Sequence, residues 1–210
     1  WYNALCYYLE LDKKFGDGNY AKRLSVIVKA IKDNFYNYFW CEERGHLADY
    51  VDEEGQNIFT RPNQLIACSV PYSPIEEDVK MKVLEAVERE LLTTRGVRTL
   101  SPKNPMYKGV YEGNQVVRDY AHHNGCAYPW LLGPYITAYL KLQGKFWIPK
   151  GLHLIHAFEE DMTIHGIGTV AEMYDGNPPF IPHGCISSAN SVGELIRAKY
   201  VLTRSGGKKR

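Results

Sequence analysis

The feature that most constrains the fold is a helical spacing of apolar residues that recurs along nearly the whole chain. Between residues 20 and 39, apolar side chains return at the i, i+3, i+4, i+7 intervals of an amphipathic helix. These positions are Leu24, Ile27, Val28, Ile31, Phe35 and Tyr38. Because the same period continues in most later segments, the sequence predicts an all-α fold.

Residues that start and stop helices divide this pattern into segments. The turn residues 16–19 end the first segment, and Pro62 fits the first turn of a later one. Pro129 moves the start of another helix towards Leu132. We expect helices over residues 1–15, 20–39, 61–70, 73–92, 128–142, 151–164 and 188–203, and a small hairpin over 45–57 that turns at Glu54-Gly55.

Two long connections separate these helices. Residues 95–126 and 167–187 are rich in Gly, Asn, Pro and Tyr. Loops longer than about 12–15 residues in a compact domain are usually functional or disordered, and the aromatic residues in both segments argue against disorder. We therefore expect one helical domain over residues 1–203 with a loop-rich functional end, followed by a flexible tail over 204–210.

Composition narrows the classes of function. The 210 residues carry a net charge of +1, which gives no electrostatic reason to expect nucleic acid or an anionic membrane as a partner. No apolar run approaches the roughly 20 residues of a membrane-spanning helix. The 5 cysteines form no CxxC pair, which favours reduced thiols and a cytoplasmic location. The chain has no starting Met, and we expect it to be part of a larger protein.

The loop over residues 168–185 carries two carboxylates beside aromatic residues. Glu172 and Asp175 lie near Tyr174 and Phe180. A sugar ring stacks on an aromatic surface, and a carboxylate can take a proton from water or protonate a glycosidic oxygen. The alternative is that both are capping residues or solvated charges. Acidic loop residues are common, so composition alone favours this second interpretation.

Two further polar clusters could bind a neutral polyol. Residues 109–130 combine Arg118, Asp119, His122, His123 and Asn124 with Trp130 and other aromatic residues. The adjacent histidines point in different directions and lack a third ligand at a metal-binding spacing, so we predict no metal.

The second cluster, Arg61, Asn63 and Gln64, opens a helix, where polar side chains either bind ligand oxygens or cap the helix. Nucleotide-binding glycine loops are absent from the sequence, and we predict no cofactor.

Several motifs follow one another in an order that resembles a known family. They are Trp1-Tyr-Asn-Ala-Leu5, Arg61-Pro-Asn-Gln64, Gly96-Val-Arg-Thr-Leu-Ser-Pro102, Arg118-Asp119, His123-Asn-Gly125, Pro129-Trp-Leu-Leu-Gly-Pro-Tyr135 and Glu172-Met-Tyr-Asp-Gly176. The series resembles the C-terminal catalytic domain of glycogen debranching enzymes, the amylo-α-1,6-glucosidases of bacteria and archaea. The resemblance extends from Trp1 to about Thr203.

This resemblance implies part of an (α/α)6 toroid, with the active site where the long loops gather. It implies hydrolysis of single α-1,6-linked glucosyl groups with inversion, with Glu172 at the position of the general base. The family's general acid is an aspartate that precedes the Trp1 motif, and Asp119 is a weak internal substitute. The implied substrate contacts are Arg61, Asn63, Gln64, Arg118, Asp119, His123, Asn124, Trp130, Tyr174 and Asp175.

The chain also departs from the family pattern. The family usually has Asp, Gln, Thr and Trp at Asn114, Asn124, Cys126 and Tyr128, and Gln-Ala-Trp-Ser at residues 188–191. Two alternatives therefore stay open: a degenerate, non-catalytic carbohydrate-binding domain, and a toroid hydrolase for another α-glucoside. The expected partners are a branched α-glucan or oligosaccharide, and either a second copy of the chain or the remaining part of the same enzyme.

Overall fold

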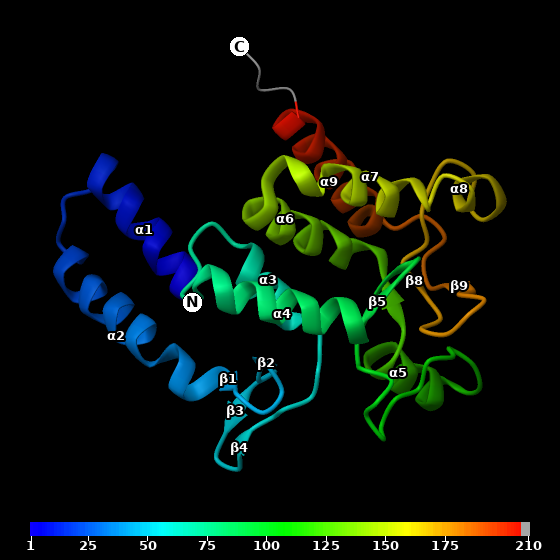
Figure 1. The fold of residues 1–210 in the computed structure, drawn as a ribbon, viewed down its shortest axis with the longest axis horizontal. Coiled ribbons are helices and arrows are strands. Elements are labelled where there is room, and N and C mark those ends of the chain that lie inside the picture. The colour runs from blue at the N-terminus through cyan, green and yellow to red at the C-terminus, as the bar shows by residue number, and fades with distance from the viewer. Residues whose placement is uncertain (207–210) are drawn as a thin grey trace.

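The computed structural model describes residues 1–206 and confirms that the chain is mostly helical (Figure 1). Its α-helices are α1 (Tyr2–Phe15), α2 (Ala21–Phe39), α3 (Asn63–Ser69), α4 (Glu77–Glu90), α5 (Gln115–Asn124), α6 (Leu132–Gln143), α7 (Ile148–His156), α8 (Asp161–Ile164) and α9 (Ala189–Gly206). Two 3₁₀ turns, η1 (Pro129–Leu131) and η2 (Gly144–Trp147), flank α6. Within residues 1–206 no helix is both long and apolar enough to cross a membrane.

The helices form two groups that differ in how many of their side chains are buried. Helix α6 packs against α3 and α9, while α4 contacts α3 and α6, and α7 contacts α6 and α9. Side chains with no exposed surface fill the interior of this group, among them Leu65, Leu84, Tyr135 and Leu202. Helices α1 and α2 pair with each other at the opposite end of the molecule (Figure 1), and α2 contributes no buried residue.

The two long connections hold structure that the sequence pattern did not predict. They contain α5 and most of a five-stranded antiparallel sheet in the order β5 (Leu92–Thr93), β6 (Gly96–Arg98), β7 (Ala127–Tyr128), β8 (Met173–Tyr174) and β9 (Pro182–His183). Strands this short show no alternation of apolar and polar residues, because alternation needs about four residues or more to be recognised. The sheet brings the two predicted loops side by side.

The predicted hairpin over 45–57 is two small ladders. Strand β1 (Trp40–Cys41) pairs with β2 (His46–Leu47), and β3 (Val51–Asp52) pairs with β4 (Gly55–Gln56). The turn falls one residue earlier than predicted, because the Asp52 carboxylate accepts a hydrogen bond from the backbone N–H of Glu54 at 2.9 Å. Gly55, at φ 111°, then pairs opposite Asp52.

Two helix boundaries differ from the prediction. The helix expected over 151–164 begins earlier, at Ile148, with a proline in its first turn, and breaks after His156 before α8. The predicted tail over 204–210 is wrong for residues 204–206, because α9 continues to Gly206. The Arg204 guanidinium lies 4.9 Å from the centre of the Tyr200 ring, a contact that stabilises this last turn. Residues 207–210 lie outside the described part.

Candidate active site

Glu172, the predicted general base, stands directly before β8 and is held by the segment that follows β9. Its backbone N–H donates to the Cys185 carbonyl at 2.9 Å. The Cys185 backbone N–H donates in return to Oε2 of Glu172, also at 2.9 Å. Among residues 1–206, Oε1 has no hydrogen-bond partner, and the side chain is partly exposed. The carboxylate is therefore fixed in position with one oxygen available to a ligand or water.

The geometry of this contact depends on Gly184. The residue adopts φ 73°, in the left-handed region that favours glycine. A Cβ added to Gly184 would lie 2.6 Å from Oε2 of Glu172 and 3.1 Å from its Cβ. Any larger residue would push the carboxylate away from the Cys185 N–H. The sequence pattern did not assign this role to Gly184, because the contact joins residues that are separated by twelve positions in the chain and meet only in the fold.

His122 and Tyr128 lie close enough to Glu172 to sense its charge. Burial, and then the charge of neighbouring His123, lower the pKa of His122, while Glu172 and Asp119 act in the opposite direction. Burial is also the main cause that raises the pKa of the Tyr128 hydroxyl, and the Glu172 charge adds to it. The His122 and Tyr128 rings meet edge to face, with centroids 5.4 Å apart. The His122 imidazole and the Tyr128 phenol are therefore both favoured in their neutral forms in the neighbourhood of Glu172.

The start of α9 is tied to the backbone of Glu172 and of a residue just before it. The Ser188 N–H donates to the Val170 carbonyl at 3.0 Å, and the Ser191 hydroxyl donates to the Glu172 carbonyl at 3.4 Å. Asn190, between these two serines, is exposed. Residue 190 departs from the family pattern, and the fold places it in the first turn of α9, directly before the serine that contacts the Glu172 backbone.

Two predicted contacts next to Glu172 are used inside the protein. Tyr174 has no exposed surface, and its hydroxyl donates to Asp161, so its ring cannot serve as the platform for a sugar that we expected. Asp175 is 5% exposed, and its Oδ1 accepts from the Tyr111 N–H at 2.8 Å and from Nε2 of His183 at 2.9 Å. Asp175 thereby fastens the segment of Tyr111 to β9.

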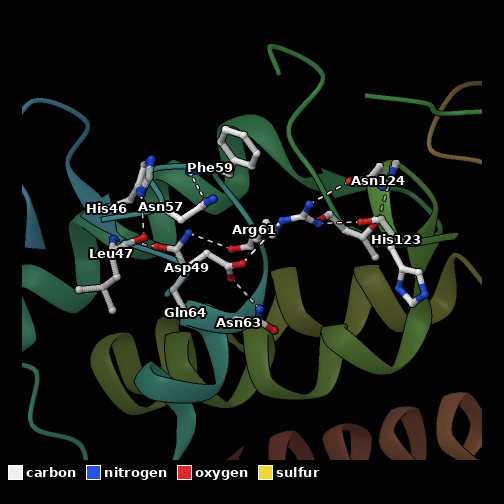
Figure 2. A network of polar contacts seen from close by, with 12 residues as sticks. His46, Leu47, Asp49, Asn57, Phe59, Arg61, Asn63, Gln64, His123 and Asn124 are labelled. Atoms are coloured by element: carbon white, nitrogen blue, oxygen red, sulfur yellow. Dashed lines mark hydrogen bonds and ion pairs between the residues drawn. The ribbon is translucent and has the colours of Figure 1, made fainter. Parts of the chain in front are cut away.

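Arg61 joins three separate segments rather than facing an open site (Figure 2). Its Nη1 donates to the carbonyls of Thr99 at 3.0 Å and His123 at 2.7 Å, and its Nη2 donates to Oδ1 of Asn124 at 2.9 Å. Its Nε lies 3.6 Å from a carboxylate oxygen of Asp49. The guanidinium thus anchors the C-terminal end of α5, which carries His122 and His123.

The amide side chains around Arg61 also form hydrogen bonds within the protein. Gln64 accepts from the Leu47 N–H at 3.2 Å and donates to the Arg61 carbonyl at 3.0 Å. Asn124 also donates to the Tyr120 carbonyl at 2.9 Å. Asn63 is exposed and uses only its Nδ2, which donates to Asp49 at 2.7 Å. Of these predicted substrate contacts, Asn63 keeps an oxygen that no described residue uses.

The remaining predicted residues lie on α5 and η1. Arg118, Asp119 and His123 are exposed; Arg118 donates to the Gly113 carbonyl at 3.1 Å, and Asp119 makes no hydrogen bond within residues 1–206. Trp130, in η1, is half-buried. His123 contacts His122, whose pKa responds to the charges of Glu172 and Asp119.

Comparison with known proteins agrees with the motif series. The family model described as amylo-alpha-1,6-glucosidase matches residues 1–197. The neutral trehalase of Saccharomyces cerevisiae has a similar fold, with a TM-score of 0.69 at 11% sequence identity, over 97% of this chain and 36% of the trehalase chain. The chain thus spans about a third of that relative, and the prediction of an all-α fold of the (α/α)6 toroid type is confirmed. The chain belongs to the amylo-alpha-1,6-glucosidase family.

Proposed function

We propose that this chain supplies the general base and part of the substrate site of a glycoside hydrolase that removes α-1,6-linked glucose from branched glucans. The observation that carries the proposal is the state of Glu172. One carboxylate oxygen is fixed by a main-chain N–H, and the other has no partner among the described residues. A fixed carboxylate with a free oxygen beside neutral aromatic groups can orient and deprotonate a water molecule.

In the proposed reaction, Oε1 of Glu172 takes a proton from water as the water oxygen attacks the anomeric carbon. The bond from that carbon to the glycosidic oxygen breaks, and a general acid protonates the departing oxygen. The two carboxyl groups of such an enzyme stand about 6.5–9.5 Å apart, which leaves room for the water. Since attack comes from the face opposite the leaving group, an α-linkage releases β-glucose.

The proposal takes the general acid from outside this chain, as the family resemblance implies. Asp175 already accepts two hydrogen bonds through Oδ1. Glu194 accepts hydrogen bonds from Arg197 through both of its oxygens. Asp119 is exposed and makes no hydrogen bond within residues 1–206. Asp175 and Glu194 are thus engaged inside the protein, and no hydrogen bond holds Asp119 in a fixed position.

Because the cysteines Cys6, Cys41, Cys68, Cys126 and Cys185 are all free, the proposal places the enzyme in a reducing compartment such as the cytoplasm.

Proton NMR of the first product tests the proposal. The intact protein would be given a branched limit dextrin, trehalose and maltotriose in separate reactions. We expect β-glucose to appear first, from the branched dextrin alone. Release of glucose from trehalose instead would favour a hydrolase for another α-glucoside, and release of α-glucose would contradict inversion. Binding of the dextrin without turnover would favour the non-catalytic alternative.

A further inference from the structure

The strand that leads to the Glu172 contact is short and lies at the edge of the sheet. Within residues 1–206, β9 is the last of the five strands, and only β8 pairs with it. The pairing covers two positions, Met173 opposite His183 and Tyr174 opposite Pro182. Because proline has no N–H, Pro182 cannot donate a hydrogen bond to β8. Main-chain pairing of this length, with one donor missing, fixes the register of β9 weakly.

A glycine bulge follows directly after His183, which lies opposite Met173. A regular antiparallel ladder would then place Gly184 opposite Glu172. Instead, the Glu172 N–H donates to the Cys185 carbonyl at 2.9 Å, so Gly184 is an extra residue in the outer strand. Its φ of 73° is the conformation that glycine adopts in a common type of β-bulge. The bulge turns the Cys185 N–H towards Oε2 of Glu172, which accepts from it at 2.9 Å.

A side-chain hydrogen bond holds the strand in front of this bulge. Nε2 of His183 lies 2.9 Å from Oδ1 of Asp175, the residue that follows β8. Since an ionised carboxylate only accepts hydrogen bonds, Nε2 carries a proton and donates it. Asp175 is buried, and its Oδ1 also accepts from the Tyr111 N–H at 2.8 Å. The imidazole is therefore bound to a fixed anchor, and this bond opposes any slip of β9 along β8.

We propose that His183 is a positioning residue for the general base. The proposal rests on the proposed function above. By holding β9 in register through Asp175, His183 fixes the bulge that aims the Cys185 N–H at Oε2 of Glu172. The carboxylate then keeps one orientation, with Oε1 available to the attacking water. This role requires no contact between His183 and the substrate.

Amide hydrogen exchange in the intact protein, labelled with ¹⁵N only at cysteine, tests the positioning without a reaction. Cys185→Ser identifies the signal of that residue. His183→Leu removes the donor, so the Cys185 amide should exchange on the order of 10-fold faster, the worth of one hydrogen bond. The amides of the buried Cys68 and Cys126 should exchange as before. Equal acceleration at all three cysteines, or none at Cys185, would overturn the proposal.

The conservative variant and a matched control accompany this measurement. His183→Gln keeps a side-chain N–H that can take the place of Nε2–H, so the Cys185 amide should exchange as in the parent protein. His153→Leu is the control, because His153 is exposed on α7 and its side chain makes no hydrogen bond within residues 1–206. It should leave exchange at Cys185 unchanged.

Kinetics on a branched limit dextrin separate positioning from substrate binding. At a temperature at which all variants are folded, His183→Leu should lower kcat on the order of 10- to 100-fold with little change in KM. The reason is that displacement of a catalytic group by about 1 Å can cost a factor of about 100. His183→Gln should recover most of this loss, and His153→Leu should leave both constants unchanged.

A double variant shows whether His183 acts through the base. Added to Glu172→Gln, His183→Leu should lower the remaining rate by less than about 2-fold, because residues that act as a unit have non-additive effects. The full loss in both backgrounds, or a rise in KM in place of the fall in kcat, would overturn the positioning role and leave the hydrolase proposal intact. A parent protein that hydrolyses no glucan, with Cys185 exchange that still depends on His183, would overturn the proposed function and support the contact that positions Glu172.

Discussion

Two groups of polar residues, one around Arg61 and one around Glu172, were both expected to contact substrate and behave differently in the structure. Around Arg61, both Nη atoms donate hydrogen bonds, and the buried amides of Gln64 and Asn124 have partners on both of their polar atoms. At Glu172, one oxygen is bound and the other has no partner within residues 1–206. A buried polar group whose atoms all have hydrogen-bond partners stabilises the fold. A carboxylate that is held by one oxygen and has no partner on the other can act on a ligand.

The position of a residue in a motif therefore does not by itself distinguish a residue that stabilises the fold from one that acts on a ligand. Arg61 and Glu172 were both expected at the substrate. Arg61 is anchored to carbonyls of Thr99 and His123, which lie far apart in sequence, and no local pattern reveals such contacts. We therefore expect substitutions in the Arg61 group to change stability and substitution of Glu172 to change the rate of the reaction.

The largest expected effect on stability comes from Arg61→Lys. A lysine ammonium lacks the planar fork of a guanidinium, so it cannot serve Asn124 and the two carbonyls together. We expect a loss of about 2–4 kcal/mol in the free energy of unfolding in urea, because hydrogen bonds from a charged group contribute about 1.5–3 kcal/mol each. The KM of the folded variant should change little.

Arg118→Lys is the control for that substitution. Arg118 is exposed and makes one hydrogen bond, to the Gly113 carbonyl. Its replacement should shift stability by less than about 0.5 kcal/mol. If Arg61→Lys proved equally mild in urea but raised KM strongly, Arg61 would belong to the substrate site after all.

A smaller loss of stability is expected for Asp175→Asn. The buried carboxylate accepts from Tyr111 and from His183, and the amide that replaces it is a weaker acceptor for both. We expect a cost of about 1–2 kcal/mol in the free energy of unfolding. The exposed Asp119 provides the matched change, Asp119→Asn, for which thermal and urea unfolding should be nearly unaltered. Equal unfolding midpoints for the two variants would refute a structural role for Asp175.

The smallest effect concerns the pH dependence of stability. Because the folded protein holds the pKa of His122 below its usual value of about 6.5, the unfolded chain takes up the proton first as pH falls. His122 therefore makes stability decrease as pH drops below about 6.5, until the folded-state pKa is passed. Unfolding of His122→Gln measured between pH 5 and 7.5 should lack this part of the slope. The exposed control His153→Gln should keep it, and an identical slope in all three proteins would disprove the effect.

Most of the helices, and the loop that holds Glu172, were predictable from the sequence. Period and capping residues located α2 and α4 to within a few residues, because both are long and amphipathic. The short strands β7 and β8 were not predicted. Their pairing joins residues about fifty positions apart in the chain, so it leaves no local pattern in the sequence.

The site was predictable in its residue types and not in its arrangement. The carbonyl and N–H of Cys185 that hold Glu172 reach it through tertiary contacts. Tyr174 illustrates the opposite case, because a loop tyrosine beside a carboxylate matched a sugar platform and packs instead in the interior.

The most direct test of the account is the rate of glucose release by the intact protein carrying Glu172→Gln. The amide oxygen of the new side chain can still accept from the Cys185 N–H, so unfolding should match that of the parent. Because the amide cannot take a proton from water, we expect kcat on a branched limit dextrin to fall about 10²–10⁴-fold with substrate binding largely kept. Glu112→Gln, in an exposed position of the neighbouring loop, should leave the rate unchanged. Near-normal glucose release by the Glu172 variant would contradict the account.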